Sequence, residues 1–230
     1  MLDFLTESVF FGAFLSLLFY EVGVLCKKKW KSAVLNPLLI SVILTILFLI
    51  ILKIPYSVYQ EGAKYISYLL TPATVCLAIP LYEQFELLKK NVVAILAGIV
   101  SGMLTSLTMV LIFAVVFRFT HEEYVTFLSK SITTAIGMGV SEQLGGYVAI
   151  TVAVIIMTGV IGNIIADPVC RLFGITDPVA KGIGIGSASH AIGTAKAMEI
   201  GEIEGAMSGL SIAVSGVLTV FAATVFSCFY

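Results

Sequence analysis

Residues 92–117 read VVAILAGIVSGMLTSLTMVLIFAVVF, an uninterrupted run without a charged side chain. At 1.5 Å per residue, a helix of this length is longer than the roughly 30 Å hydrocarbon core of a bilayer. Four other apolar runs of about 20 residues flank it on both sides, namely Ser8–Cys26, Val34–Leu52, Gly146–Ala166 and Gly205–Phe229. The sequence therefore predicts an all-α polytopic membrane protein.

The composition agrees with this fold class. The chain is 59% hydrophobic and only 12% charged, about half the charged share of a soluble domain. We therefore expect residues 1–230 to form a single integral membrane domain. The net charge of −1 gives no electrostatic reason for nucleic-acid binding. The first residues, Met1–Glu7, lack the basic region of a cleavable signal, so we expect the first apolar run to be retained.

Three further apolar segments are interrupted by proline, glycine or hydroxyl residues: Tyr65–Glu83, Phe127–Gln143 and Gly182–Glu199. Proline removes a backbone donor and glycine loosens a helix, so each segment is a candidate broken or re-entrant helix. Backbone exposed by such a break persists at membrane depth only against protein or in a wet cavity. With the five clear runs, these segments predict about seven to eight transmembrane elements.

The order of these elements indicates an internal two-fold repeat. When the chain is shifted by about half its length, Thr71–Thr74 falls on Ser187–His190 and Glu83 falls on Glu199. We predict repeats over residues 1–118 and 124–230, and interrupted segments at matching positions are typical of transporters. The basic residues 27–31 favour a cytoplasmic first loop. Whether all eight elements cross, or the third of each half is re-entrant and the repeats are inverted, stays open.

The segment around Lys130 collects polar groups suited to an anion. Ser131, Thr133 and Thr134 follow the lysine, and a helix that starts there would present free N–H groups and its positive dipole end. A carboxylate would suit this combination. The alternative is that the hydroxyls bond the preceding turn and Lys130 lies at the membrane interface.

Residues 186–199 read GSASHAIGTAKAME and carry a second set of polar groups. His190 could donate a hydrogen bond to an anion or titrate near neutral pH; the alternative is a bond to a carbonyl of a neighbouring helix. Lys196 and Glu199 share a helix face and could form an ion pair or take part in coupling. A solvated helix end is the alternative for that pair.

Together these segments predict one substrate-binding site, formed by Thr74, Lys130, Ser131, Thr133, Thr134, Ser187, Ser189, His190, Gly193, Thr194 and Lys196. The four cysteines have no metal-ligand spacing and the chain has two histidines, so we expect neither a metal nor a cofactor. Walker, zinc-protease and nucleophile-elbow motifs are absent from the sequence. The serines around His190 have no apparent acidic partner, and we do not expect an enzyme.

Several of these stretches resemble the LrgB/CidB family, and the resemblance covers nearly the whole chain. The matching stretches are Ser187–Ala197, Ser129–Thr134, Asn36-Pro37-Leu38 and Pro72-Ala73-Thr74 running to Pro80-Leu81-Tyr82. Where related sequences often have proline, this chain has Ser129 and Ala135. We therefore expect Gly137 and Gly139 to shape the break there.

The resemblance implies a multi-pass protein of the bacterial plasma membrane that acts with a small holin-like partner of the LrgA/CidA type. Bacterial members are described as antiholin-like regulators of murein hydrolase activity and autolysis. Other relatives are carriers, including the plastidial glycolate/glycerate translocator and pairs linked to pyruvate uptake. We also expect homo-oligomers.

The interrupted segments favour transport between these two functions. A carrier of an anion needs half-helix ends, hydroxyls and a positive group near the midplane, whereas a pore-former or scaffold has no need of broken helices at matched positions. The sequence therefore predicts a carrier of small carboxylates of the pyruvate or glycolate type. The alternative is a regulatory membrane subunit without transport of its own.

Overall fold

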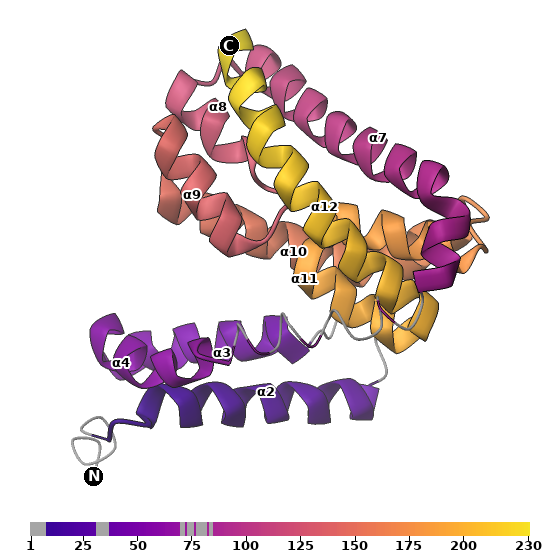
Figure 1. Ribbon diagram of the computed structural model, residues 1–230. Helices are drawn as coiled ribbons and strands as arrows, with labels where there is room; N and C mark the ends of the chain where they lie inside the picture. The colour runs from indigo at the N-terminus through magenta and orange to yellow at the C-terminus, as the bar shows by residue number, and fades with distance from the viewer. Residues whose placement is uncertain (1–7, 31–36, 70–71, 73–75, 77–81, 83–84) are drawn as a thin grey trace. The chain divides into compact units, whose positions relative to one another are not determined.

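The protein is all-helical over the residues that the structure, a computed structural model, describes: 8–30, 37–69, 72, 76, 82 and 85–230. It is an all-α polytopic membrane protein, as predicted (Figure 1). Its principal elements are α2 (Phe11–Trp30), α3 (Pro37–Ile51), α4 (Tyr56–Ser67), α7 (Phe85–Phe117), α8 (His121–Leu128), α9 (Thr134–Leu144), α10 (Val148–Leu172), α11 (Pro178–Ile200), α12 (Glu202–Phe226) and the 3₁₀ turn η1 (Ser227–Phe229).

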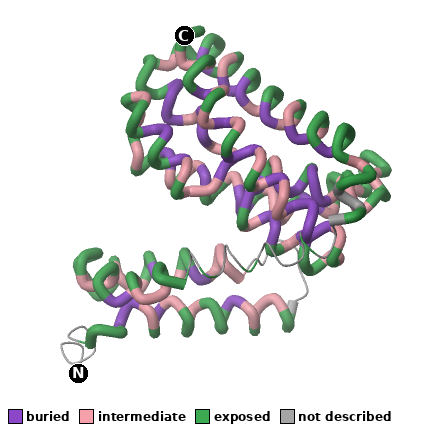
Figure 2. The backbone as a smooth tube through the Cα atoms, viewed as in Figure 1, coloured by how far each residue is buried: buried purple, intermediate pink, exposed green. Residues whose placement is uncertain are grey.

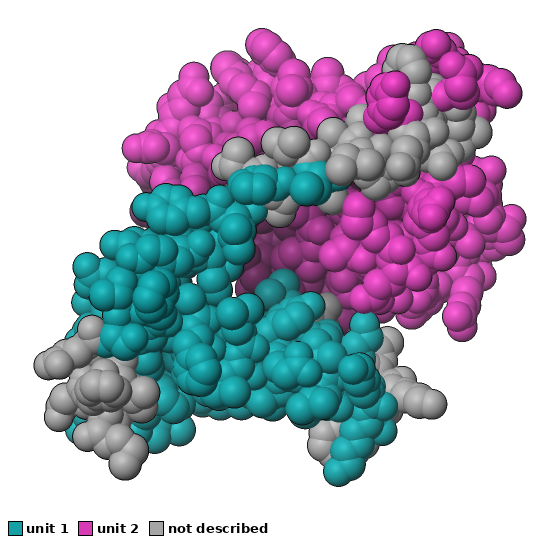
Figure 3. Space-filling model, turned by 60° about the horizontal axis from the view of Figure 1, so that its bottom comes forward, with its two compact units in different colours: residues 1–76 teal, residues 77–230 magenta. Residues whose placement is uncertain are grey.

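The chain divides into two compact units, residues 1–76 and 77–230 (Figure 3). This boundary differs from that of the predicted repeats, which stay a prediction. In the first unit α2 packs against α3 and α4. Gly12 and Gly62 let the α2 and α4 backbones touch, because a Cβ at either position would overlap the other helix. The Ser16 hydroxyl lies 2.8 Å from that of Tyr59 across the same contact.

Three described helices are long and apolar enough to cross a bilayer: Lys89–Phe117, Val148–Leu172 and Glu202–Phe229. All three belong to the second unit and correspond to three of the five predicted spans. In the first unit, the predicted span Val34–Leu52 contains the shorter apolar helix α3. The predicted span Ser8–Cys26 overlaps α2, which continues to Trp30.

Helices α7 and α12 run in the same direction, and α10 runs against them. The start of α7 packs with the start of α12, since Ile99 and Met207 share a buried cluster. Farther along, Val110 and Ala223 share another cluster. The start of α10 lies at the opposite end, where the Thr151 hydroxyl donates to the carbonyl of Thr126 in α8 at 3.0 Å.

Helices α8 and α9 form a hairpin, named here the first hairpin, whose tip is residues 129–133. The N–H of Tyr147, just after α9, donates to the Thr126 hydroxyl at 2.8 Å, so the two arms meet again at their open end. At the tip, the Ser129 hydroxyl donates to the carbonyl of Gly137 at 3.2 Å. The expectation that Gly137 and Gly139 shape the break is wrong, because both lie inside α9, which begins at Thr134.

Helix α11 folds back on itself at His190, whose backbone has φ 42° and ψ −139°. In a straight helix Gly193 would lie about 12 Å along the axis from Ile185. Here a Cβ on Gly193 would lie only 3.0 Å from the carbonyl oxygen of Ile185, so the chain has turned back. Gly186 and Thr194 both lie against Ser208 of α12. The two halves of α11 therefore form a second hairpin, with its tip at Ser189 and His190. The break predicted for Gly182–Glu199 is confirmed, while the inverted repeats that went with a re-entrant segment stay a prediction.

The two hairpins enter the second unit from opposite ends. The first starts beside the C-terminus, where the Tyr124 hydroxyl donates to the carbonyl of Phe226 at 2.8 Å. The second starts and finishes beside the beginning of α12, since Gly182 and Met198 flank Glu204 and Gly205. Three crossing helices thus frame two half-length hairpins whose tips approach each other.

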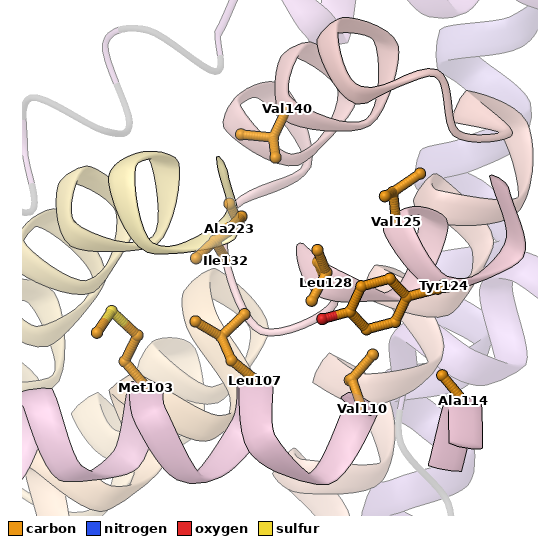
Figure 4. Close-up of a cluster of buried hydrophobic side chains, with 10 residues drawn as sticks. All are labelled: Met103, Leu107, Val110, Ala114, Tyr124, Val125, Leu128, Ile132, Val140 and Ala223. Carbon is orange, nitrogen blue, oxygen red and sulfur yellow. The ribbon is translucent and has the colours of Figure 1, made fainter. Parts of the chain in front are cut away.

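A buried apolar cluster closes the end of this unit that contains Tyr124. It joins α7, the first hairpin and α12 through side chains that include Leu107, Tyr124, Leu128 and Ile132, all at most 2% exposed (Figure 4). Along the same helices, buried positions alternate with exposed ones (Figure 2). The exposed positions are themselves apolar, for example Val93 and Val116 of α7, as expected for a surface that faces lipid.

Candidate functional site

The second unit contains a groove of about 980 Å³ between α7, α10 and the first half of α11. The face of α7 that lines it runs from Asn91 to Met109, about 27 Å along the helix. Small and hydroxyl-bearing residues dominate this face, namely Ala94, Gly98, Ser101, Gly102, Thr105 and Ser106. The groove therefore offers hydrogen-bonding groups within helices that are otherwise apolar.

The tip of the first hairpin supplies the basic group of the groove. The Lys130 ammonium donates to the Ser131 hydroxyl at 3.0 Å, and that hydroxyl lies 3.1 Å from the hydroxyl of Ser106 on α7. Ser106 comes 17 residues after Lys89 and 11 before Phe117 in the crossing stretch, so this contact lies near mid-membrane depth. Within the described part of the chain, no carboxylate lies within ion-pair distance of Lys130.

The second hairpin supplies the facing wall. Ser187 and Ser189 line the groove on either side of Ala188. Ser187 donates back to the carbonyl of Ile183 at 2.7 Å. Ser189 is 1% exposed and packs on Gly162 of α10 so closely that a Cβ there would overlap its hydroxyl. The structure thus brings together Lys130, Ser131, Ser187 and Ser189 from the two predicted segments.

His190 points away from the groove. Its Nε2 lies 2.9 Å from the carbonyl oxygen of Ile155 in α10, and because a carbonyl only accepts, Nε2 carries the proton and donates. Gly159 makes room for the ring, since a Cβ there would lie 2.7 Å from His190 Cε1. This is the contact with a neighbouring helix carbonyl that the sequence left as the alternative.

The other predicted residues lie outside the groove lining. Thr194 is buried and bonded to Ser208 at 2.7 Å, and Gly193 packs inside the second hairpin. Thr133 caps α9 and Thr134 begins it. Thr74 lies outside the described residues. A substrate-binding role for these residues stays a prediction.

Lys196 lies in the returning half of α11 within an ion-pair group. Its ammonium is 3.5 Å from Glu199 and 3.1 Å from Asp167 of α10. The sequence reasoning considered Glu199 because of its three-residue spacing, but Asp167 gave no such signal. Asn163 was missed for the same reason; its side chain donates to the carbonyl of Ile192 at 3.0 Å, just beyond the turn of the second hairpin.

The hydroxyl face of α7 was also missed. Ser101, Thr105 and Ser106 stand in an uninterrupted apolar run, where single hydroxyls did not suggest a site. Ser101 lies four residues before Thr105 and Ser106 four after Gly102, and with Gly98 these spacings of three and four place the residues on one helix face. That periodicity was the signal available in the sequence.

The groove reaches the end of the unit where α7 and α11 begin, since Asn91 and Asp177 line it there. Four basic residues belong to the segments at this end, which is named here the basic end: Lys89, Lys90, Arg171 and Lys181. The opposite end has Arg118 among its described connecting residues. The sequence left two arrangements open, one with eight crossings and one with a re-entrant third element in each half. Neither places Lys89, Lys90, Arg171 and Lys181 at the same end, because both count Phe127–Gln143 as a crossing.

Comparison with known proteins places this architecture in a family. The model of the LrgB-like family matches residues 16–229. The holin-like protein CidB of Staphylococcus epidermidis, from strains ATCC 35984 and ATCC 12228, is 35% identical over 205 residues, which are 89% of this chain and 90% of the relative. No solved structure matches the chain. The chain, in which the tips of two hairpins meet at a groove that contains Lys130, therefore belongs to the LrgB-like family.

Proposed function

We propose that this protein carries small carboxylates of the pyruvate or glycolate type across the bacterial plasma membrane, without enzymatic activity. The observation that supports this most is Lys130, a lysine near mid-membrane depth, in a groove, with no carboxylate partner among the described side chains. A lysine at the centre of a membrane helix costs about 2.5–3.5 kcal/mol. An anion that enters the groove would offset that cost.

The groups around Lys130 suit a carboxylate. Such an anion has two acceptor oxygens, and charge-assisted hydrogen bonds to them are stronger than neutral ones. The ammonium has two N–H donors besides the one that it gives to Ser131, and the Ser131–Ser106 pair has one hydroxyl hydrogen left to donate. Among the described residues that line the groove Lys130 is the one lysine, so a monocarboxylate fits the charge of the groove better than a dicarboxylate.

The two hairpins support movement of a substrate across this depth. Carriers commonly place the substrate at interrupted helices near the bilayer midplane. Here the groove extends from Lys130 to the basic end, whereas a buried apolar cluster fills the opposite end. Basic residues concentrate on the cytoplasmic side of membrane proteins, so we assign the basic end to the cytoplasm. The groove then opens inward.

Uptake into proteoliposomes tests this function. Purified protein is reconstituted alone and with a partner of the LrgA/CidA type, and uptake of labelled pyruvate, glycolate and lactate is measured. We expect saturable uptake of at least one of them, strongly reduced by Lys130→Ala. If neither preparation moves any of the three under any gradient, the carrier function is wrong.

The relatives named above are holin-like proteins, and this favours a second candidate function. As a regulatory subunit, the chain would bind a small holin-like partner, or assemble into homo-oligomers, and control murein hydrolase activity without transport. In that case Lys130→Ala would leave autolysis unchanged, while substitutions on partner-facing surfaces would alter it. Measuring uptake and autolysis on the same variants separates the two.

A further inference from the structure

A second, much smaller cavity lies behind the groove, at the same depth. It has about 10 Å³ of space, room for about one water-sized particle. Ser106, Ser131 and Ser187 line both cavities, and Ser215 and Thr219 of α12 close the far side. Met103, Leu107 and Leu128 complete its wall. Five hydroxyl-bearing residues therefore line one small space, named here the chamber.

Thr219 lines the chamber from α12. It is 5% exposed, yet within the described part of the chain its hydroxyl has no hydrogen-bond partner, and it faces the chamber. Ser215 makes only a long bond, 3.3 Å to the carbonyl of Ile212. The hydroxyls of Thr219 and Ser215 therefore keep lone pairs that a particle in the chamber could contact.

Two helix C-terminal ends bring partial negative charge to the chamber. Leu128, the last residue of α8, lines it, and so does Ser187, which lies two residues before the end of the first half of α11. The C-terminal end of a helix carries a partial negative charge and unpaired carbonyls. Two such ends meet here because both hairpins turn at this depth. Among the described residues that line the chamber there is no carboxylate, which disfavours the divalent ions Ca²⁺ and Mg²⁺.

We propose that this chamber binds one dehydrated monovalent cation of the size of Na⁺. Hydroxyl oxygens of Ser106, Ser131, Ser187, Ser215 and Thr219 would be its ligands. Binding stands on the chamber alone, whereas a role of the cation as coupling ion rests on the carrier function proposed above.

Lys130 connects the chamber to the groove. Its ammonium contacts Ser131 from the groove side at 3.0 Å, so it repels a cation held on the other side of that hydroxyl. A carboxylate bound at Lys130 would reduce this repulsion. Anion and cation should therefore bind cooperatively, and the coupling must be equal in both directions.

Direct binding of ²²Na⁺ to the purified full-length protein tests the site without transport. We expect saturable binding that excess NaCl displaces and KCl or choline chloride does not. Thr219→Val, which keeps the shape of the side chain, should raise the dissociation constant by about tenfold or more. Thr219→Ser should stay close to the unmodified protein. Thr224→Val removes an exposed hydroxyl on the same helix and should change nothing.

Two further measurements keep the outcomes separate. If Thr219→Val does not fold, as judged by gel filtration, Ser215→Ala takes its place. Pyruvate at millimolar concentration should lower the Na⁺ dissociation constant in the unmodified protein and not in Lys130→Gln. If no saturable ²²Na⁺ binding is found, or if Thr219→Val and Ser215→Ala bind Na⁺ normally, the chamber holds only water and the proposal is wrong. Carboxylate uptake that is independent of Na⁺ would leave the carrier function intact and reject coupling.

Discussion

The Nε2 atom of His190 donates a hydrogen bond to the carbonyl oxygen of Ile155 at 2.9 Å, joining the turn of the second hairpin to α10. The histidine backbone has φ 42° and ψ −139°, a region that residues with a Cβ rarely occupy. Such a conformation persists only where surrounding contacts impose it. The imidazole bond is one of these contacts, so this polar segment uses its histidine to hold a turn.

Replacing His190 should therefore reduce stability. We expect His190→Ala to lower the free energy of unfolding by about 1–3 kcal/mol, because a buried hydrogen bond is lost. His190→Gly should be less damaging by about 1 kcal/mol, since glycine accepts this backbone conformation without strain. Thermal unfolding in detergent compares the two variants. Equal melting temperatures would show that the turn is not strained.

Lys130 should be essential for transport and dispensable for folding. Lys130→Ala and Lys130→Gln are expected to lower the uptake rate at least about tenfold, the effect of losing one charged hydrogen bond. Lys89→Ala removes an exposed lysine of α7 and serves as the matched control. Uptake in proteoliposomes checks both. Normal uptake by Lys130→Gln would show that substrate binding does not need the positive charge of Lys130.

Gly162 should tolerate no side chain. A Cβ there would overlap the Ser189 hydroxyl, so Gly162→Ala must displace the tip of the second hairpin, at about 1–3 kcal/mol. Gly139 of α9 has no atom within 4 Å of the same position, and Gly139→Ala is the control. The melting temperatures of the two variants in detergent should differ, with only Gly162→Ala lowered. Equal values would contradict the close contact.

The groove should be reachable from the cytoplasm. In a background without the four native cysteines, Ser101→Cys should react with a membrane-impermeant maleimide in inside-out vesicles and stay protected in right-side-out ones. Glu122→Cys, exposed at the start of α8, should show the opposite pattern. The reverse result for both positions would invert the assigned orientation.

The Lys196–Asp167 pair should contribute modestly. Both side chains are partly exposed, 21% and 41%, and exposed pairs are usually worth no more than about 1 kcal/mol. A double-mutant cycle with Lys196→Gln and Asp167→Asn measures the coupling by thermal unfolding. A coupling well above that figure would indicate a structural lock between α10 and the second hairpin.

The residues of the candidate site were predictable only in part. Lys130, Ser131, Ser187 and Ser189 stood out in the sequence because polar groups are costly in apolar segments, and all four line the groove. Ser101, Thr105 and Ser106 did not, because single hydroxyls in a helix can bond the preceding turn at little cost. Indeed, Thr105 donates to the carbonyl of Ser101 at 2.7 Å.

The sequence by itself determined the fold class and two of the three interrupted segments, Phe127–Gln143 and Gly182–Glu199, because hydropathy and helix-breaking residues act locally along the chain. The third, Tyr65–Glu83, lies largely outside the described residues. Only the tertiary structure decided how those segments are used. Contacts between distant helices decide that α11 reverses at His190 and that His190 faces Ile155 instead of the groove. They also bring Asp167 to Lys196. These contacts follow from packing geometry, and the local pattern of residues carries no record of which neighbour a side chain will meet.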